Sequence, residues 1–270
     1  MEIIVNNFDL SSTLLSGQCF RVYEEDDGSF TCILNDRVIN IKQEGDILKV
    51  SSSNENNLKD IIINYFDLDR DYESLNNEIC KDSIMKECVS KCKGYKLLKQ
   101  DGFEMCISYI ISQNNNVKRI SKSIELLCKN RGTEIVFNNN NYYLFPSYEQ
   151  IKDITLDELR SYGVGFRDKY IKCFLDNYNT MRDISLLNTN DALDELMKVK
   201  GIGMKVASCI LLFGYSRFDV FPIDTWVKHF IAEKYNIKDN QKIISKFASE
   251  KFGKYSGLAI QYMFHSQRNV

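Results

Sequence analysis

The sequence predicts an α+β fold, in which an N-terminal antiparallel β-sheet domain (residues 1–92) is followed by a mostly α-helical domain (residues 93–270). The first part contains short runs of β-branched and aromatic residues separated by turn residues, which is typical of antiparallel strands. The second part places its apolar residues three and four positions apart, as amphipathic helices do. Within it, a Gly-Ile-Gly sequence (Gly201 and Gly203) joins two such patterns and indicates a helix-hairpin-helix unit.

The N-terminal part contains three expected strands: Ser29–Asn35, Arg37–Gln43 and Asp46–Ser51. Turn-forming residues at Asn35-Asp36 and Glu44-Gly45-Asp46 separate them. A helix is expected over Asn57–Phe66. We interpret this layer mainly as a structural platform.

From about Gly94 the chain is expected to be helical. The predicted helices are Phe103–Ser112, Val117–Lys129, Asp191–Val199, Gln241–Phe252 and Tyr255–Gln267. The sequence Thr155-x-x-Glu158 fits a capping box for a short helix that ends near Gly163. The asparagine run at Asn138–Asn141 is interpreted as a loop that carries little information.

The composition is that of a globular protein with a substantial core: 270 residues, of which 44% are hydrophobic and 27% are charged. No apolar run approaches the roughly 18 residues of a membrane-spanning helix, and the N-terminus has no signal-peptide pattern. Nine irregularly spaced cysteines fit reduced thiols in a cytosolic protein. We therefore expect neither secretion nor membrane attachment.

The net charge of −2 conceals an uneven distribution. Residues 1–75 carry 6 Lys and Arg against 15 Asp and Glu, whereas the remainder carries 29 against 22. A surface that binds nucleic acid is therefore expected in the C-terminal two-thirds of the chain.

The Gly-Ile-Gly turn and the helix after it form a candidate anion site. Glycine permits a positive φ and the close approach of a foreign backbone, and free N–H groups at a helix start bind phosphate. A helix-hairpin-helix can therefore clamp a nucleic-acid backbone without reading its sequence. The alternative is a simple tight turn between two helices.

Lys205 and Asp224 give this unit candidate chemistry. Lys205 lies in the first helical turn after Gly203, among apolar and small residues, where a charged ammonium is destabilised. A neutral amine can attack a sugar carbon and form a Schiff base. Asp224 lies 19 residues later, where it can cap a helix and hold an ionised carboxylate in place. The alternatives are a surface or phosphate-binding lysine and a purely structural cap.

The stretch Leu196–Phe230 resembles the helix-hairpin-helix, Gly/Pro/Asp superfamily of base-excision DNA glycosylases. Within that superfamily the chain is similar to the 8-oxoguanine DNA glycosylase/lyase family. Three further motifs match in the same order: SGQCFR at Ser16–Arg21, SQNNNVKR at Ser112–Arg119 and GVGFRDKY at Gly163–Tyr170. The similarity covers nearly the whole chain.

The resemblance implies a bifunctional base-excision-repair enzyme with Lys205 and Asp224 as its catalytic residues. It also implies that the carbonyl of Gly17 contacts the damaged base. 8-Oxoguanine has a hydrogen on N7 where guanine has a lone pair, so this carbonyl discriminates between them. The expected pocket for the base contains Gly17, Cys209, Phe213, Gln261 and Phe264.

The DNA-binding residues that the resemblance implies are Asn114, Arg119, Phe166, Arg167, Gly201, Gly203 and Trp226. Asn114, Arg119 and Arg167 would contact the base opposite the lesion, preferably cytosine, which offers two acceptors. Phe166 would be a wedge that fills the gap left by the flipped base. Alone, such a phenylalanine is more often part of a core.

Three positions depart from the family pattern. Lys200 stands where relatives often have proline, and Trp226 replaces a histidine at the DNA backbone. Ile260 occupies the place of an expected glutamine, although Gln261 is adjacent.

No cofactor is expected. Related enzymes carry an iron–sulfur cluster on four cysteines after the hairpin, but this chain has no cysteine after Cys209. With only His229 and His265, an ordinary zinc site is not expected either. The expected partner is double-stranded DNA containing oxidised guanine, bound by a monomer in the bacterial cytoplasm (nucleoid) or the eukaryotic nucleus.

Two other functions remain open. A monofunctional glycosylase for alkylated bases would keep Asp224, activate water, and not require a lysine at position 205. A DNA-binding module without chemistry would respond to replacement of Asp224 only through its affinity. Strand cleavage after base release separates these possibilities from a bifunctional enzyme.

Overall fold

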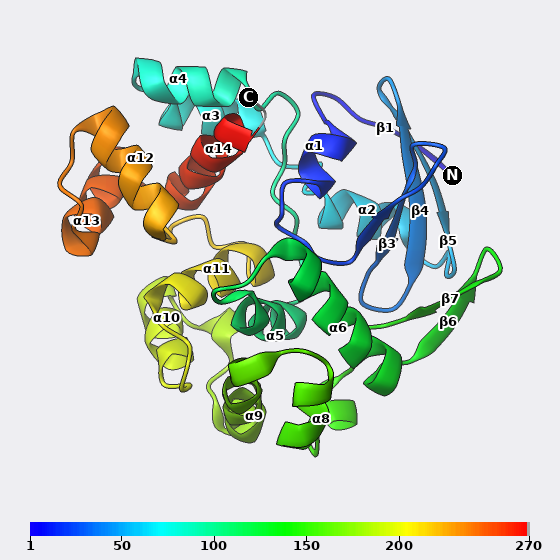
Figure 1. Ribbon diagram of the computed structural model, residues 1–270. Helices are drawn as coiled ribbons and strands as arrows, with labels where there is room; N and C mark the ends of the chain where they lie inside the picture. Colours follow the sequence, from blue (N-terminus) through cyan, green and yellow to red (C-terminus); the bar gives the residue numbers. More distant parts are fainter. Residues whose placement is uncertain (269–270) are drawn as a thin grey trace.

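The computed structural model describes residues 1–268 and confirms the predicted α+β architecture (Figure 1). A five-stranded antiparallel sheet has the strand order β1-β5-β4-β3-β2. The predicted strands are confirmed as β3 (Phe30–Ile33), β4 (Val38–Glu44) and β5 (Ile47–Ser52). Two edge strands, β1 (Glu2–Ile4) and β2 (Val22–Glu24), escape prediction because so short a segment becomes a strand only through pairing.

One face of this sheet forms a core with helix α2 (Leu58–Tyr65), which confirms the helix predicted there. Ile41 pairs with Val50, and both side chains are buried against α2. On β5, buried and exposed residues alternate, as expected for a strand with one covered face. Burying each such aliphatic side chain contributes roughly 1.5–3 kcal/mol.

The helical elements are, in chain order, α1 (Leu10–Leu14), α2, α3 (Tyr72–Ile79), α4 (Ser83–Ser90), α5 (Gly102–Ser112), α6 (Val117–Arg131), α7 (Tyr148–Ile151), α8 (Leu156–Ser161), η1 (Gly165–Arg167), α9 (Asp168–Asn177), η2 (Tyr178–Thr180), η3 (Ile184–Leu186), α10 (Thr189–Met197), α11 (Met204–Gly214), α12 (Thr225–Tyr235), α13 (Gln241–Phe252), η4 (Gly253–Tyr255) and α14 (Ser256–Arg268). The five predicted helices correspond to α5, α6, α10, α13 and α14. The capping box between Thr155 and Glu158 is present and starts α8. None of the helices described combines the length and apolar character that crossing a bilayer requires.

Helices α3 and α4 follow the sheet domain in sequence but pack with the last helices of the chain. In Figure 1 they lie beside α14, and contacts join α4 to α14 and α3 to α13. Their buried residues Tyr72, Ile79 and Met85 belong to the large helical core, whereas the sheet and α2 have a core of their own. The change of core therefore precedes the expected boundary at residue 92.

The asparagine run differs from its expected loop. Asn138 and Asn139 form a tight turn with φ of 49° and 61°, while Asn140 and Asn141 begin strand β7 (Asn140–Tyr143), paired with β6 (Glu134–Phe137). Two successive residues with positive φ match the two-residue hairpin turn that asparagine favours. This hairpin packs on the sheet through Phe137, next to Ile33 and Val38. The hairpin therefore forms a packing contact between the helical part and the sheet (Figure 1).

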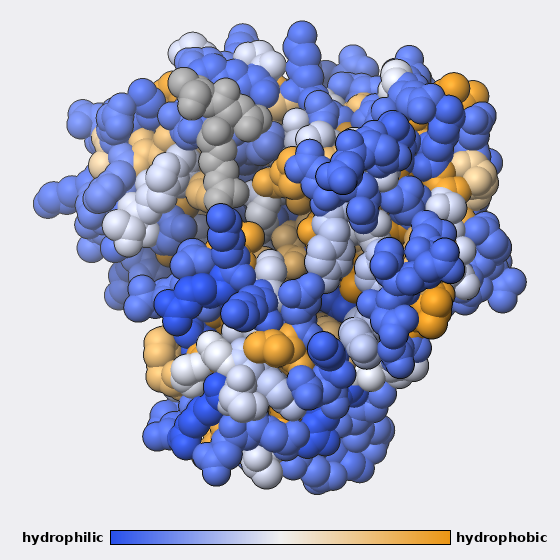
Figure 2. All heavy atoms as spheres, turned by 45° about the vertical axis from the view of Figure 1, so that its right-hand side comes forward, coloured by the Kyte–Doolittle hydropathy of each residue, from blue (hydrophilic) through white to orange (hydrophobic). Residues whose placement is uncertain are grey.

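The surface shown in Figure 2 is largely hydrophilic, with hydrophobic residues in small, separate groups. The described residues include few large hydrophobic side chains that are strongly exposed, among them Ile4, Val136, Phe166 and Leu186. The prominent apolar surface is therefore internal, where the helices of the second part meet.

Candidate active site

The Gly-Ile-Gly turn connects α10 to α11, and glycine stands at its two positions for different structural reasons. Gly201 has a φ of 94°, and a Cβ on it would lie 2.2 Å from Cγ of Tyr170. Gly203 has a φ of −94°, and a Cβ there would meet no atom within 4 Å. The fold thus requires glycine at position 201, whereas the open space at Gly203 leaves room for an approaching backbone.

The start of α11 is suited to an anion. Gly203 is its N-cap and has no side chain, so no side chain caps the first-turn N–H groups. These groups carry the partial positive charge of a helix N-terminus. They lie on the exposed side of the hairpin, because Gly203 and Met204 are both exposed. This geometry fits a phosphate of a nucleic-acid backbone.

Lys205 lies in the first turn of α11, directly after this exposed segment, and is half-buried. Its Nζ is 6.0 Å from the centroid of the Tyr109 ring on α5. The following residues of α11 from Val206 to Phe213 are all buried, so only the first turn reaches the open side. The amine is therefore placed between the exposed hairpin and the apolar interior.

Asp224 is the N-cap of α12, as the sequence predicts. Its Oδ1 accepts a hydrogen bond from the backbone N–H of Val227 at 2.9 Å. The residue has extended backbone geometry and is half-buried after the buried pair Pro222 and Ile223. The cap fixes one carboxylate oxygen, and the side chain remains next to the cavity that Lys205 also lines.

A small cavity of about 120 Å³ brings the predicted site together. Lys205 and Asp224 both line it, and so do all five residues expected to bind the base: Gly17, Cys209, Phe213, Gln261 and Phe264. Those seven residues come from the N-terminal part, α11, the start of α12 and α14, so only the tertiary fold unites them. The cavity therefore brings an amine and a carboxylate next to aromatic rings and an amide side chain.

The segment around Gly17 is held in place by the side chain of Gln18. Its amide donates to the carbonyls of Thr13 and Lys96 at 3.0 and 2.9 Å, and its Oε1 accepts from Leu98 N–H at 2.8 Å. Gly17 has a φ of 87°, a backbone conformation that favours glycine. The buried glutamine therefore presents a rigid glycine backbone to the cavity.

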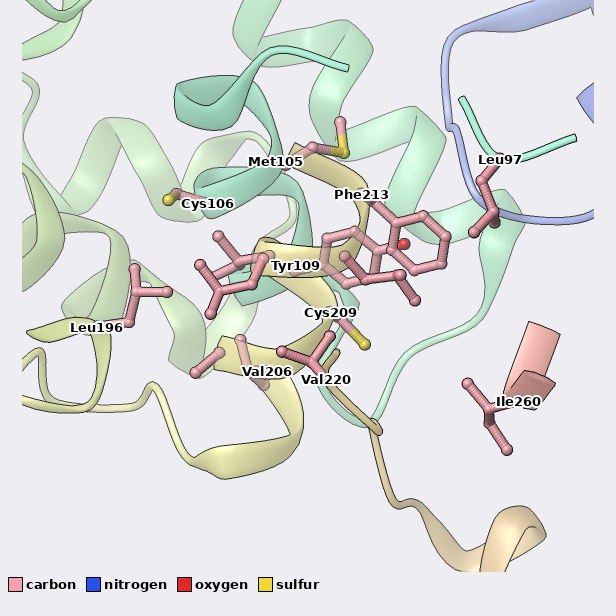
Figure 3. Packing of buried hydrophobic residues seen from close by; sticks show 14 of the residues in the cluster. Leu97, Met105, Cys106, Tyr109, Leu196, Val206, Cys209, Phe213, Val220 and Ile260 are labelled. Atoms are coloured by element: carbon pink, nitrogen blue, oxygen red, sulfur yellow. The ribbon is translucent and has the colours of Figure 1, made fainter. Parts of the chain in front are cut away.

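Tyr109 is a cavity residue that our sequence analysis misses. Its ring stacks on Phe213 with centroids 5.4 Å apart and an interplanar angle of 6°. Figure 3 shows these two rings face to face, with Cys209 close by on α11. Helix α5 is buried on nearly all sides, so its sequence has no polar face that would mark Tyr109 as special.

Cys209 presents a thiol to the cavity. Burial raises its pKa, the nearby Asp224 adds to the rise, and the nearby Lys205 only partly offsets it. The sulfur is therefore neutral at ordinary pH, which suits contact with the face of a base rather than nucleophilic attack.

Of the positions that depart from the family pattern, Ile260 lines the cavity and Trp226 contacts the lining residue Phe264. Ile260 is buried and lines the cavity, and Figure 3 shows that it comes from a helix separate from α11. Trp226 places its ring edge-on to Phe264, with centroids 5.1 Å apart, and stacks on Phe230 at 5.2 Å. In this structure Trp226 thus supports the aromatic wall.

A second group of predicted residues lies on the exposed turns between helices. Phe166 is 55% exposed, which is unusual for phenylalanine and fits a wedge. Asn114 and Arg119 are exposed at the turn before α6 and in its first turn, and Asn114 has a φ of 46°. These side chains are exposed where a partner could meet them, and the Phe166 ring also contacts Tyr170 edge-on.

Arg167, which the sequence predicts as a contact to the opposite base, makes hydrogen bonds within the protein. It is buried, and its guanidinium donates to backbone carbonyls of Gln113, Asn114 and Val164. Burial, and secondarily the charge of Arg119, lowers its pKa. In this structure Arg167 fixes the turn that presents Asn114, because an arginine fork can satisfy several carbonyls at once.

Comparison with known proteins shows which families and relatives the chain matches. Residues 1–106 match the N-terminal domain of 8-oxoguanine DNA glycosylase, and residues 107–254 match the HhH-GPD superfamily of base excision DNA repair proteins. A probable N-glycosylase/DNA lyase from Methanothermobacter thermautotrophicus is 28% identical over 99% of this chain and 96% of its own length.

Two solved structures are similar to this chain over nearly its full length. MBOgg1 in complex with a low-affinity DNA ligand has a TM-score of 0.94 and 36% identity, covering 99% of this chain and 95% of that one. The Clostridium acetobutylicum 8-oxoguanine glycosylase/lyase, in complex with double-stranded DNA containing cytosine opposite 8-oxoguanine, has a TM-score of 0.92 and 33% identity, covering 100% and 98%.

A hairpin that can clamp DNA, with a lysine and a capping aspartate in the cavity behind it, is the architecture of a helix-hairpin-helix base excision DNA repair protein, and the chain belongs to this HhH-GPD superfamily. Within the superfamily it belongs to the 8-oxoguanine DNA glycosylase/lyase family. It is a DNA N-glycosylase with DNA lyase activity, and it binds DNA.

Proposed function

We propose that this enzyme excises 8-oxoguanine from duplex DNA through a covalent lysine intermediate and then cleaves the strand by β-elimination. The observation that carries the proposal is the cavity that Lys205 and Asp224 line together with Gly17. An amine, a carboxylate and a backbone segment with positive φ converge there from three separate parts of the chain. Two relatives, MBOgg1 and the Clostridium enzyme, share this fold over nearly the full length.

In the first step, the Lys205 amine attacks C1′ of the damaged nucleotide, and the bond from C1′ to the base breaks with its electron pair going to the base. The Asp224 carboxylate stabilises the positive charge that develops on the sugar, as carboxylates do in glycoside cleavage. The departing base takes the proton that the amine nitrogen loses on attack and leaves as the neutral purine. The sugar ring then opens: the C1′–O4′ bond breaks, O4′ keeps its electron pair and takes a proton from water, and the nitrogen lone pair forms the iminium (Schiff base) between Nζ and C1′.

In the second step, the iminium makes the C2′ hydrogen acidic. Loss of this proton forms a double bond between C2′ and C3′, and the 3′ phosphate departs with the electrons of its C–O bond. Hydrolysis of the Schiff base then releases Lys205. The sequence of steps needs no cofactor.

Recognition of the lesion rests on hydrogen bonding at N7. The Gly17 carbonyl accepts a hydrogen bond from N7–H of 8-oxoguanine. In guanine, N7 carries a lone pair instead, so two hydrogen-bond acceptors would face each other and repel. The three hydrogen bonds of Gln18 hold this segment rigidly, which favours discrimination. The neutral thiol of Cys209 and the Phe264 ring offer contact to the two faces of the flipped base.

Preference for cytosine opposite the lesion is assigned to Arg119 and Asn114. Both are exposed, and cytosine offers two acceptors on its unpaired edge. Adenine would leave a charged donor unpaired at a cost of about 1–3 kcal/mol. Arg167 contributes indirectly by fixing the turn that carries Asn114.

Borohydride trapping tests the lysine. The wild-type enzyme is expected to form a covalent adduct with duplex DNA containing 8-oxoguanine, and Lys205→Gln is expected to form none. Lys200→Gln is the matched control, because Lys200 is an exposed lysine of the same hairpin. An adduct that persists in Lys205→Gln and vanishes in Lys200→Gln would exclude Lys205 as the nucleophile.

A panel of lesions tests the substrate. Base release and strand cleavage are measured separately on duplexes with 8-oxoguanine or alkylated purines. We expect release of 8-oxoguanine followed by cleavage. Release of alkylated bases without cleavage would favour the monofunctional alternative.

A further inference from the structure

A second cavity, of about 770 Å³, lies where the sheet domain meets the helical domain. Its lining comes from the segment before β2, from the end of β3 and the turn after it, from α2, from the N-terminal end of α5 and from the C-terminal end of α11 with the residues after it. It shares no lining residue with the cavity of Lys205 and Asp224. The catalytic chemistry does not involve it.

The charged groups that a ligand could reach in this cavity are carboxylates. Its two basic residues are engaged, since Arg21 donates to the carbonyl of Tyr143 and Lys99 pairs with Asp67 at 2.7 Å. The remaining guanidinium nitrogens of Arg21, Nε and Nη1, are enclosed by protein atoms and cannot reach a ligand. An anionic ligand would therefore find no available cation.

Glu104 on α5 lines the cavity and is only 9% exposed. Within residues 1–268 its carboxylate makes no hydrogen bond or ion pair, although the charge of Arg21 is near enough to act on it; its backbone N–H donates to the cap Asp101. A buried carboxylate without a partner is costly, because desolvation is not compensated. Asp60, exposed on α2, adds a second carboxylate at the rim.

Aromatic rings form the apolar part of the same cavity. Phe20 is nearly buried, and Tyr65 and Tyr215 are half-buried. The Tyr215 ring lies directly on Gly102, where a Cβ would meet its Cζ at 2.6 Å. Aromatic faces attract organic cations, most strongly where water is excluded.

We propose that this interdomain cavity binds a small planar organic cation of the amidinium or guanidinium class, with Glu104 as its counter-ion and the rings of Phe20, Tyr65 and Tyr215 as its walls. Two parallel N–H groups of such a ligand match the two oxygens of a carboxylate. The proposal is independent of the chemistry at Lys205.

Protonation of Glu104 gives the site a distinctive property. Burial raises its pKa to about 7, Asp101 adds to the rise, and Arg21 opposes it. The other titratable groups that face it are Cys19, Tyr65 and Cys128, all with raised pKa and therefore neutral. Binding of a cation requires the ionised carboxylate, so acid should weaken binding.

Calorimetric titration of the full-length enzyme with benzamidine tests the proposal. We expect one saturable site at pH 8 and an affinity roughly tenfold or more weaker at pH 5.5, where a carboxyl of pKa about 7 is only a few per cent ionised. Glu104→Gln should lose at least tenfold in affinity and the pH dependence, while keeping base release. Asp224→Asn, the control in the other cavity, should bind benzamidine as the wild type does.

Two results would overturn the proposal: no saturable binding at pH 8, or binding that Asp224→Asn abolishes and Glu104→Gln leaves intact. If Glu104→Gln does not fold, a crystal structure of the wild-type enzyme with benzamidine decides the question. The amidinium is expected beside the Glu104 carboxylate, and its placement elsewhere would contradict the assignment.

Discussion

Gly201 lies flat against the ring of Tyr170, so that a Cβ on it would be 2.2 Å from Cγ. The same tyrosine ring meets Phe166 edge-on, with centroids 6.0 Å apart. One aromatic ring on α9 therefore contacts both the Gly-Ile-Gly hairpin and the exposed Phe166. The relative position of these two proposed DNA contacts depends on the absence of a side chain at position 201.

The two hairpin glycines should respond differently to alanine. Gly201→Ala is expected to lower the free energy of unfolding by about 2–4 kcal/mol, because it adds both a strained φ and a clash with Tyr170. Gly203→Ala should change it by less than about 0.5 kcal/mol and weaken DNA binding instead. Urea unfolding and binding to a duplex with an abasic-site analogue measure the two effects. Equal destabilisation by both variants would contradict this distinction.

Replacement of Arg119 should affect recognition of the opposite base, whereas replacement of Arg167 should affect folding stability. Arg119→Ala is expected to leave stability nearly unchanged and to bring the excision rates opposite the four bases closer together. Arg167→Ala should destabilise by about 2–4 kcal/mol, because three backbone carbonyls, one of them in a buried hydrogen bond, lose a charged donor. Single-turnover excision opposite each base and thermal unfolding provide the measurements. Unchanged cytosine preference in Arg119→Ala would reduce that arginine to a phosphate contact.

Trp226 should act through Phe264. Trp226→Leu removes the edge-on contact with Phe264, so the single-turnover excision rate should fall by roughly tenfold, about 1.4 kcal/mol, with DNA affinity unchanged. Trp226→Phe, which keeps an aromatic ring, is the matched control and should retain most of the rate. A loss of affinity with an unchanged rate would instead make Trp226 a backbone contact.

Glu104 should make folding stability fall as pH rises. Its pKa is about 7 in the folded enzyme and near 4.5 when unfolded, so the folded state binds more protons between these values. The free energy of unfolding should therefore decline from about pH 4.5 to 7 by up to about 3 kcal/mol relative to Glu104→Gln. Comparing the urea midpoints of the two proteins from pH 5 to 8 isolates this contribution. Parallel curves would show that Glu104 ionises normally.

Local sequence patterns were sufficient to predict the elements whose formation depends on residues close by in the sequence. The three central strands, helix α2 and the cap at Asp224 follow from alternation, periodicity and a capping residue. The asparagine hairpin shows the limit, since Asn140 and Asn141 have low strand preference and pair only because Phe137 is buried against the sheet. The core change before residue 92 likewise arises from packing of α3 and α4 on α13 and α14.

By itself, the sequence identified the residues to which we assign the chemistry: a lysine after a glycine turn, and an aspartate that begins the next helix. Those features act over a few residues, where backbone geometry and capping are decided locally. Only the tertiary structure decided that Tyr109 contacts the cavity, that Arg167 is buried under the Asn114 turn, and that Trp226 supports Phe264. The physical reason is that burial and side-chain contact depend on segments distant in sequence, and no local pattern records which of them will meet.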